Sequence, residues 1–96
     1  MYGTVARMRV KPGMEAQLLE FGRSEMPLSI PGARTQIVFR TDANPQEYYL
    51  VVVFDSKETY VANADSPEQD ARYQQLRALL AEDPEWHDGE VVDFWP

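Results

Sequence analysis

The segment from Glu47 to Phe54 constrains the fold more than any other part of this 96-residue chain. It is rich in β-branched and aromatic residues, which favour a strand, and its residues of both parities are apolar. A strand with this pattern has to be covered on both faces. Helices in so short a chain can cover only one face of a sheet, so we expect a second copy of the chain to cover the other face in a homodimer.

Three further strands are predicted around this segment. Residues 2–10 alternate with the period of a strand, and Tyr2, Thr4, Ala6, Met8 and Val10 share one side. Residues 33–40 are expected to form a hairpin with the 47–54 segment, because residues 41–46 between them are typical of a loop. Alternating apolar residues at 90–95 predict the last strand.

Helices are predicted in the two longer connections. The first begins near Met14, carries apolar residues at helical spacing and should end before Pro27, with residues 28–30 extended. Asp55 and Glu58 predict a capping box for a short second helix. Ser66 is the expected N-cap of a third helix that continues to Pro84. The whole chain, residues 1–96, is therefore predicted to be one α+β domain with a ferredoxin-like β-α-β-β-α-β order and a four-stranded antiparallel sheet.

Composition excludes several classes of partner. Sixteen acidic and nine basic residues give a formal net charge of -7, which opposes binding to nucleic acid or to an anionic membrane surface. The chain contains no cysteine, so it has no disulfide, thiolate nucleophile or cysteine-ligated metal. No basic leader or apolar stretch long enough to span a bilayer is present, and we expect a cytoplasmic protein that binds neither nucleic acid nor membranes.

Three sequence features together resemble a known family. They are the residues 5–13, Val-Ala-Arg-Met-Arg-Val-Lys-Pro-Gly, leading into the first helix, the strand at 48–54 running into Asp-Ser-Lys-Glu, and the helix that begins at Ser66-Pro67. In these features the chain resembles the antibiotic biosynthesis monooxygenases, which belong to the dimeric α+β barrels. The resemblance implies that two sheets pair face to face in a homodimer and that each chain keeps a pocket between its own sheet and its helices.

Members of this family differ in activity, so the resemblance alone does not decide the function. Some oxidise phenolic or anthrone-like compounds with O2 and no cofactor, some degrade haem and some oxidise quinols. For this chain we expect a cofactor-independent monooxygenase acting on a small hydroxylated aromatic or quinol, with neither cofactor nor metal, although flavin is left open. The alternative is a non-catalytic dimeric module that binds a small molecule or responds to stress.

The haem-degrading branch provides a specific comparison. It relies on an asparagine in the first strand, a tryptophan in the short helix and a histidine ligand in the last helix. An ungapped match places Ala6, Asn63 and Tyr73 at these three positions. Since all three residues differ, the resemblance argues against haem degradation.

Asn63 and Tyr73 are the candidate catalytic residues on the two later helices, and Tyr60 is a candidate substrate-binding residue one helical turn before Asn63. An asparagine amide can donate hydrogen bonds to a developing phenolate, and a tyrosine hydroxyl can donate or accept one. Met8, Phe21 and Leu76 are expected to provide apolar walls for an aromatic ring. The alternative is that these tyrosines belong to the core, with their hydroxyls at its edge, and that Asn63 caps a helix or faces solvent.

His87 is the third candidate catalytic residue, because it is the only histidine and can act as a general base near neutral pH. The favoured alternative is a surface histidine near the start of the last strand. Its acidic neighbours suggest either a metal site or a solvated loop, and the loop is favoured because side chains diverge around Pro84. Arg7 and Arg9 share a strand face, and Asp93 is expected opposite them on the last strand. They could bind an anion, and the favoured alternative is cross-strand ion pairing in the dimer.

Overall fold

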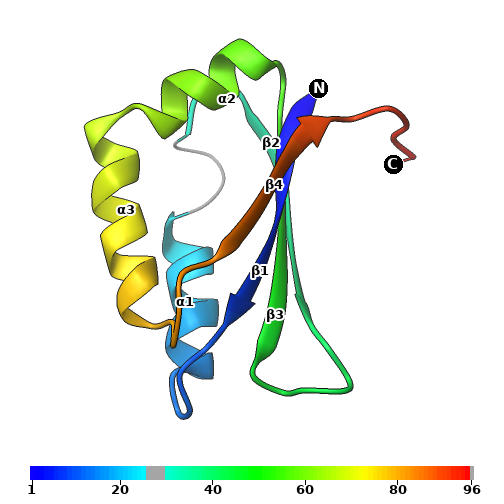
Figure 1. Ribbon diagram of the computed structural model, residues 1–96. Helices are drawn as coiled ribbons and strands as arrows, with labels where there is room; N and C mark the ends of the chain where they lie inside the picture. The colour runs from blue at the N-terminus through cyan, green and yellow to red at the C-terminus, as the bar shows by residue number, and fades with distance from the viewer. Residues whose placement is uncertain (26–29, 96) are drawn as a thin grey trace.

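The predicted sheet is present in the computed structural model, which describes residues 1–25 and 30–95. Its strands have the order β2-β3-β1-β4, and every neighbouring pair is antiparallel. Figure 1 shows the helices on one side of this sheet, and the other side bare. The described elements, in chain order, are β1 (Tyr2–Arg9), α1 (Glu15–Glu25), β2 (Ala33–Arg40), β3 (Glu47–Phe54), α2 (Lys57–Ala64), α3 (Pro67–Ala78) and β4 (Glu85–Glu90).

The strand register assigns each side chain to one of two faces. In β1, Thr4 lies opposite Val52 of β3 and Asp88 of β4, while Val5 lies opposite Val51 and His87. Successive residues of a strand point to opposite faces. Thr4 and its partners therefore belong to the inner face, which the helices cover, and Val5 and its partners belong to the bare outer face.

The solid part of the core occupies one end of the inner face. Met8, Val10, Tyr48 and Leu80 are at most 2% exposed and pack with Leu18 of α1 and Leu76 of α3. α1 is described only to Glu25, so the expected helix end at Pro27, together with Met26 and Leu28, lies outside the described residues. No helix in the described part of the chain is both long enough and apolar enough to cross a membrane.

The caps of α2 and α3 decide where the helices above the sheet begin. Ser66 caps α3 as predicted, since its side chain accepts a hydrogen bond from the Gln69 backbone N–H. The capping box of α2 consists of Ser56 and Thr59 and replaces the predicted pair one residue earlier. The physical reason is that the Asp55 backbone N–H donates to Gly32 O at 2.8 Å, so this residue is still tied to the sheet layer.

The last strand lies five residues earlier than the sequence pattern predicted. β4 is Glu85–Glu90, and residues 91–95 continue past the sheet as a tail. All six residues of β4 are exposed, because it is an edge strand that pairs through its backbone with β1 alone. The apolar residues of the tail alternate as in a strand and predicted one, but the tail pairs with no strand within the described chain.

Because β4 lies earlier than predicted, the ion pairs of β1 also differ from the predicted ones. Arg7 Nε lies 2.7 Å from Glu47 Oε2, and Arg9 Nε lies 3.5 Å from Glu82 Oε1. The hydrogen bond and charge of Glu47 raise the pKa of Arg7. The predicted pairing with Asp93 was wrong, because that residue follows the last strand and has no register position opposite β1.

Candidate functional site

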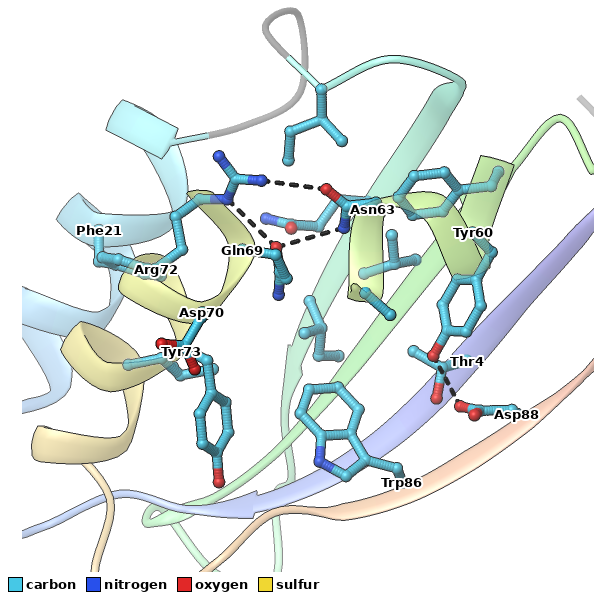
Figure 2. Close-up of a pocket in the computed structure, with 17 residues that line it drawn as sticks. Thr4, Phe21, Tyr60, Asn63, Gln69, Asp70, Arg72, Tyr73, Trp86 and Asp88 are labelled. Atoms are coloured by element: carbon cyan, nitrogen blue, oxygen red, sulfur yellow. Dashed lines mark hydrogen bonds between the residues drawn. The ribbon is translucent and has the colours of Figure 1, made fainter. Parts of the chain in front are cut away.

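A cavity of about 450 Å³ lies between the inner face of the sheet and the helices. Its walls are mainly apolar and include Leu50, Val52 and Phe54 of β3 and Leu76 of α3. Six of the polar side chains around it form two hydrogen-bonded or adjacent groups, which Figure 2 shows on different sides of the cavity, and Gln36, Asp70 and Tyr73 line it outside these groups. This arrangement suits a flat apolar ligand that carries polar groups at its edges.

The first polar group joins α2 to α3 and consists of Asn63, Gln69 and Arg72 (Figure 2). Asn63 Oδ1 accepts a hydrogen bond from Arg72 Nη2 at 3.0 Å, and Asn63 Nδ2 donates to Gln69 Oε1 at 3.2 Å. Arg72 Nε also donates to Gln69 Oε1, at 3.2 Å. Within the described residues Arg72 has no carboxylate partner, so this group brings a positive charge to the cavity.

The second polar group consists of Thr4, Tyr60 and Asp88, at the side of the cavity formed by β1, β4 and α2. The Tyr60 hydroxyl donates to Asp88 Oδ1 at 2.7 Å. Thr4 is only 5% exposed, and its hydroxyl has no hydrogen-bond partner among the described residues. Leaving a buried hydroxyl unpaired lowers stability by about 1–3 kcal/mol. The Thr4 hydroxyl can therefore still form a hydrogen bond beside the cavity.

Tyr60 is held in place by aromatic neighbours as well as by Asp88. Its ring centroid lies 5.2 Å from that of Tyr2 and 5.5 Å from that of Phe54. Burial, followed by the hydrogen bond to Asp88, raises the pKa of Tyr60 to about 12. The Thr4 hydroxyl beside the phenol opposes this rise in pKa, but the contact lacks the geometry of a hydrogen bond. Tyr60 is therefore a neutral hydrogen-bonding group across the physiological pH range.

Tyr73 and Trp86 also line the cavity, and they come from α3 and β4 respectively. Their ring centroids lie 6.4 Å apart with an interplanar angle of 49°. Figure 2 shows the two rings next to each other, away from the Asn63 group. Two aromatic side chains so placed can pack against a ligand ring.

Five of the residues predicted for the site line this one cavity, and they are Phe21, Tyr60, Asn63, Tyr73 and Leu76. Met8 does not line it. Met8 is only 2% exposed and packs in the core beside the cavity, because it lies four residues after Thr4 on β1, beyond the part of the strand that lines the cavity.

His87 lies apart from the other predicted site residues. It is within β4 and opposite Val5, and therefore on the outer face of the sheet. Its Nε2 lies 2.8 Å from Glu85 Oε1, and this pair is exposed. In the described part of the chain, no three His, Cys, Asp or Glu side chains converge to form a metal-binding cluster.

The cavity is also lined by residues that the sequence pattern did not indicate, among them Thr4, Asp88, Trp86, Gln69 and Arg72. A signal for Thr4 was available, because it is a polar residue in the row of β1 that faces the helices. Asp88 and Trp86 were missed because the last strand was predicted too late in the chain, which removed both from the sheet.

Comparison with known proteins supports this assignment of the fold. The structure superposes on a proposed antibiotic biosynthesis monooxygenase from Chloroflexus aurantiacus with a TM-score of 0.80 and 26% identity, covering 99% of this chain and 96% of the other. A similar protein from Bordetella bronchiseptica gives a TM-score of 0.81 and 23% identity, covering 95% and 96%.

A variant of SnoaB, a cofactor-independent oxygenase from Streptomyces nogalater, has the same fold, with a TM-score of 0.74 and 17% identity over 99% and 96% of the two chains. No curated protein matches the sequence significantly. The sequence model of the family named "antibiotic biosynthesis monooxygenase" matches residues 1–75. As the resemblance in sequence predicted, the chain belongs to the antibiotic biosynthesis monooxygenase family.

Proposed function

We propose that this protein is a cofactor-independent monooxygenase that oxidises a small hydroxylated aromatic or quinol with O2. The observation that carries the proposal in a chain of this family is a cavity of about 450 Å³ with mainly apolar walls and two groups of polar side chains on different sides. Cavities of roughly 300–1,000 Å³ hold small organic ligands. A fused aromatic ring fits such walls, and its oxygen substituents can reach the polar side chains.

The reaction requires an electron-rich substrate that serves as its own reductant. Removal of a proton gives a phenolate or enolate, which transfers an electron to O2. Combination of the resulting radicals forms a hydroperoxide at a ring carbon. Loss of water from this carbon leaves a carbonyl, so a ring CH2 and O2 become C=O and H2O.

The Asn63 group is suited to stabilising negative charge on such a substrate. Asn63 uses one hydrogen of its amide nitrogen for Gln69, and the second hydrogen remains for a ligand. The Arg72 guanidinium adds a positive charge close by. Donors fixed in this way before the reaction stabilise a developing oxyanion better than mobile water does.

The test is aerobic turnover of an anthrone and of a naphthoquinol by protein treated with a chelator and free of flavin and haem by absorption spectroscopy. We expect O2 to be consumed with the substrate and one labelled oxygen atom from isotopic O2 to enter the product. In the anthrone this atom becomes the new carbonyl of the anthraquinone, and in the naphthoquinol it becomes the added oxygen of a hydroxynaphthoquinone, with water as the second product in both cases. Anaerobic reactions and heat-denatured protein are the controls. Tight binding of these compounds without any turnover above the controls would contradict the monooxygenase and support the alternative, a binding module.

We also propose that the protein acts as a homodimer paired through the outer face of the sheet. Ile37 and Phe39 of β2 and Val5 of β1 lie on this face and are 46%, 53% and 42% exposed in the single chain. The tail also leaves the sheet on the side away from the helices (Figure 1), and Val92 and Trp95 in it are 93% and 85% exposed. An apolar area of this kind favours association with a second copy.

A further inference from the structure

The side of the cavity formed by β1 and β4 contains a buried hydroxyl group that no hydrogen bond within the described residues satisfies. Thr4 is 5% exposed and lines the cavity, yet its hydroxyl has no hydrogen-bond partner among the described residues. Buried polar groups in folded proteins nearly always have partners. A hydroxyl left unpaired at the wall of a cavity points to a ligand that supplies the missing partner.

The neighbouring Tyr60 has its hydrogen committed in one direction. Its hydroxyl donates to Asp88 Oδ1 at 2.7 Å, so the oxygen of Tyr60 can still accept a hydrogen bond from a ligand. Contacts with the rings of Tyr2 and Phe54 fix the orientation of the phenol. The Tyr60 oxygen can therefore accept a hydrogen bond, and then a proton, from a ligand hydroxyl, while the Tyr60 proton is already directed at Asp88.

Asp88 can complete this transfer because it lies between the cavity and solvent. It lines the cavity but belongs to the exposed edge strand β4. A carboxylate is an acceptor when ionised, and it can release a proton to water at an exposed position. His87, the neighbouring candidate base, lies on the outer face of the sheet and cannot serve this cavity.

We propose that Thr4, Tyr60 and Asp88 form a binding site for a phenolic hydroxyl, in which Asp88 is the proton acceptor and Tyr60 transfers the proton to it. This inference rests on the proposed function, since it assigns the deprotonation step and requires a substrate with a free ring hydroxyl. The O–H bond of the substrate breaks as its proton moves to the Tyr60 oxygen, and the Tyr60 proton moves to Asp88. The products are an aryloxide and a neutral Asp88 carboxyl, which later returns its proton to water.

Thr4 and Tyr60 have different tasks in this site. The Thr4 hydroxyl donates to the aryloxide oxygen and stabilises its charge as it develops. Tyr60 remains protonated before and after the step, in agreement with its pKa of about 12, which burial and the bond to Asp88 produce. It therefore transfers a proton without existing as a free tyrosinate.

A fluorescent phenol tests the site without depending on turnover. β-Naphthol becomes a strong acid in its excited state, and its neutral and anionic forms emit at different wavelengths, so its emission reports whether a proton acceptor is in contact with the hydroxyl. We expect β-naphthol bound to the wild-type protein to emit mainly as the anion. In Asp88→Asn and Tyr60→Phe the neutral emission should dominate, with less than about a tenfold change in the dissociation constant.

Matched variants separate this effect from a general change of charge or fold. Glu90→Gln removes the same charge two residues further along β4, and Tyr49→Phe removes a tyrosine hydroxyl from the outer face. Both controls should keep the anionic emission of the wild type. Failure of β-naphthol to bind, or equal anionic emission from the wild type and Asp88→Asn, would overturn the proposal.

Turnover gives a second test that distinguishes this inference from the proposed function. With an accepted quinol, Asp88→Asn should lower kcat by roughly 10²-fold and leave KM nearly unchanged, as expected for loss of a proton acceptor. Anionic emission without any quinol oxidation by the wild-type protein would refute the monooxygenase while supporting the hydroxyl site. Normal kcat in Asp88→Asn would remove Asp88 from the deprotonation step.

Discussion

The two faces of the sheet are built from the same strands but differ in what they leave unsatisfied. On the inner face, Thr4 of β1 is buried and its hydroxyl has no partner in the described residues. On the outer face, Val5 next to it is apolar and 42% exposed. The inner face thus has a hydroxyl beside the cavity that lacks a hydrogen-bond partner, whereas the outer face has apolar side chains that no other part of the described chain covers.

This difference indicates two kinds of binding partner. A hollow with apolar walls and unpaired polar groups suits a small molecule that brings both a ring and a hydroxyl. An exposed apolar surface bordered by ion pairs, such as Arg7 with Glu47, suits a second protein chain. Because neighbouring residues of β1 serve the two faces in alternation, substitutions can test each face separately.

The largest effect is expected from a charge placed on the outer face. Ile37→Asp would bury an unpaired carboxylate if two copies pair through this face, and we expect dimerisation to weaken by more than about 10²-fold. Analytical ultracentrifugation measures this change. Val61→Asp is the matched control, because Val61 is 42% exposed on α2, away from this face, and should leave the dimer intact. An unchanged dimer in Ile37→Asp would place the interface elsewhere.

A second large effect is expected in the cavity. Asn63→Ala removes a donor to the developing oxyanion and should lower the turnover of an accepted quinol by roughly 10²-fold or more. The substitution also removes the hydrogen bonds from Asn63 of α2 to Gln69 and Arg72 of α3, so we expect the free energy of unfolding to fall by about 1 kcal/mol.

Ser66→Ala controls for that loss of stability. It removes the N-cap of α3, at a cost of about 1 kcal/mol, but does not alter the cavity lining. Turnover by Ser66→Ala should stay near that of the wild type. Equal loss of turnover in both variants would mean that Asn63 acts only through the stability of the helices.

Tyr73→Phe, which changes one hydroxyl in the same cavity, should reduce turnover less than Asn63→Ala.

A moderate effect concerns alkaline pH. The pKa of Tyr60 is raised from 10.0 to about 12, so between these values the folded protein holds a proton that the unfolded chain has lost. The contribution of this group to stability is complete below pH about 10 and is lost as the pH rises towards about 12. We expect an ultraviolet titration to contain a late step from Tyr60, which should be absent in Tyr60→Phe.

Asp88→Asn should lower the midpoint of that late titration only in part, because burial is the larger cause of the raised pKa. A late step that persists in Tyr60→Phe would assign the shift to another tyrosine.

The smallest effect is a gain in stability that accompanies a loss of binding. Thr4→Val removes the unpaired buried hydroxyl with little change of shape, so the free energy of unfolding should stay equal or rise by up to about 1 kcal/mol. Binding of β-naphthol should weaken. Tyr48→Phe is the control, since its hydroxyl is also buried without a partner in the described residues but does not line the cavity. Weaker binding in both variants would argue against a specific role for Thr4.

The sequence predicted the elements that carry a strong periodic pattern. The apolar run Glu47–Phe54 and the alternation of β1 identified the sheet and both of its faces, and Ser66 identified the start of α3. These patterns are informative because burial on one or both faces dictates the residue type at each position. The five predicted cavity residues, which lie on α1, α2 and α3, followed from that framework.

The sequence predicted a fourth strand but placed it five residues too late, so the residues that β4 contributes to the cavity were missed. An exposed edge strand is specified by backbone pairing with β1, so polar residues such as Glu85 and Asp88 satisfy it and no apolar periodicity marks it. The apolar tail imitates a strand more closely than the true strand does. Because the strand was predicted in the tail, Asp88 was overlooked. Contact of the tail with a partner chain would explain its apolar residues.

The most direct test of separate roles for the two faces is an NMR titration of isotopically labelled protein with β-naphthol. We predict that resonances of Thr4, Tyr60, Asn63 and the Trp86 indole shift as the ligand binds, while those of Ile37 and Phe39 on the outer face remain unchanged. Shifts confined to the outer face, or none at the cavity residues at saturating ligand, would contradict the assignment of the inner face to a small hydroxylated aromatic.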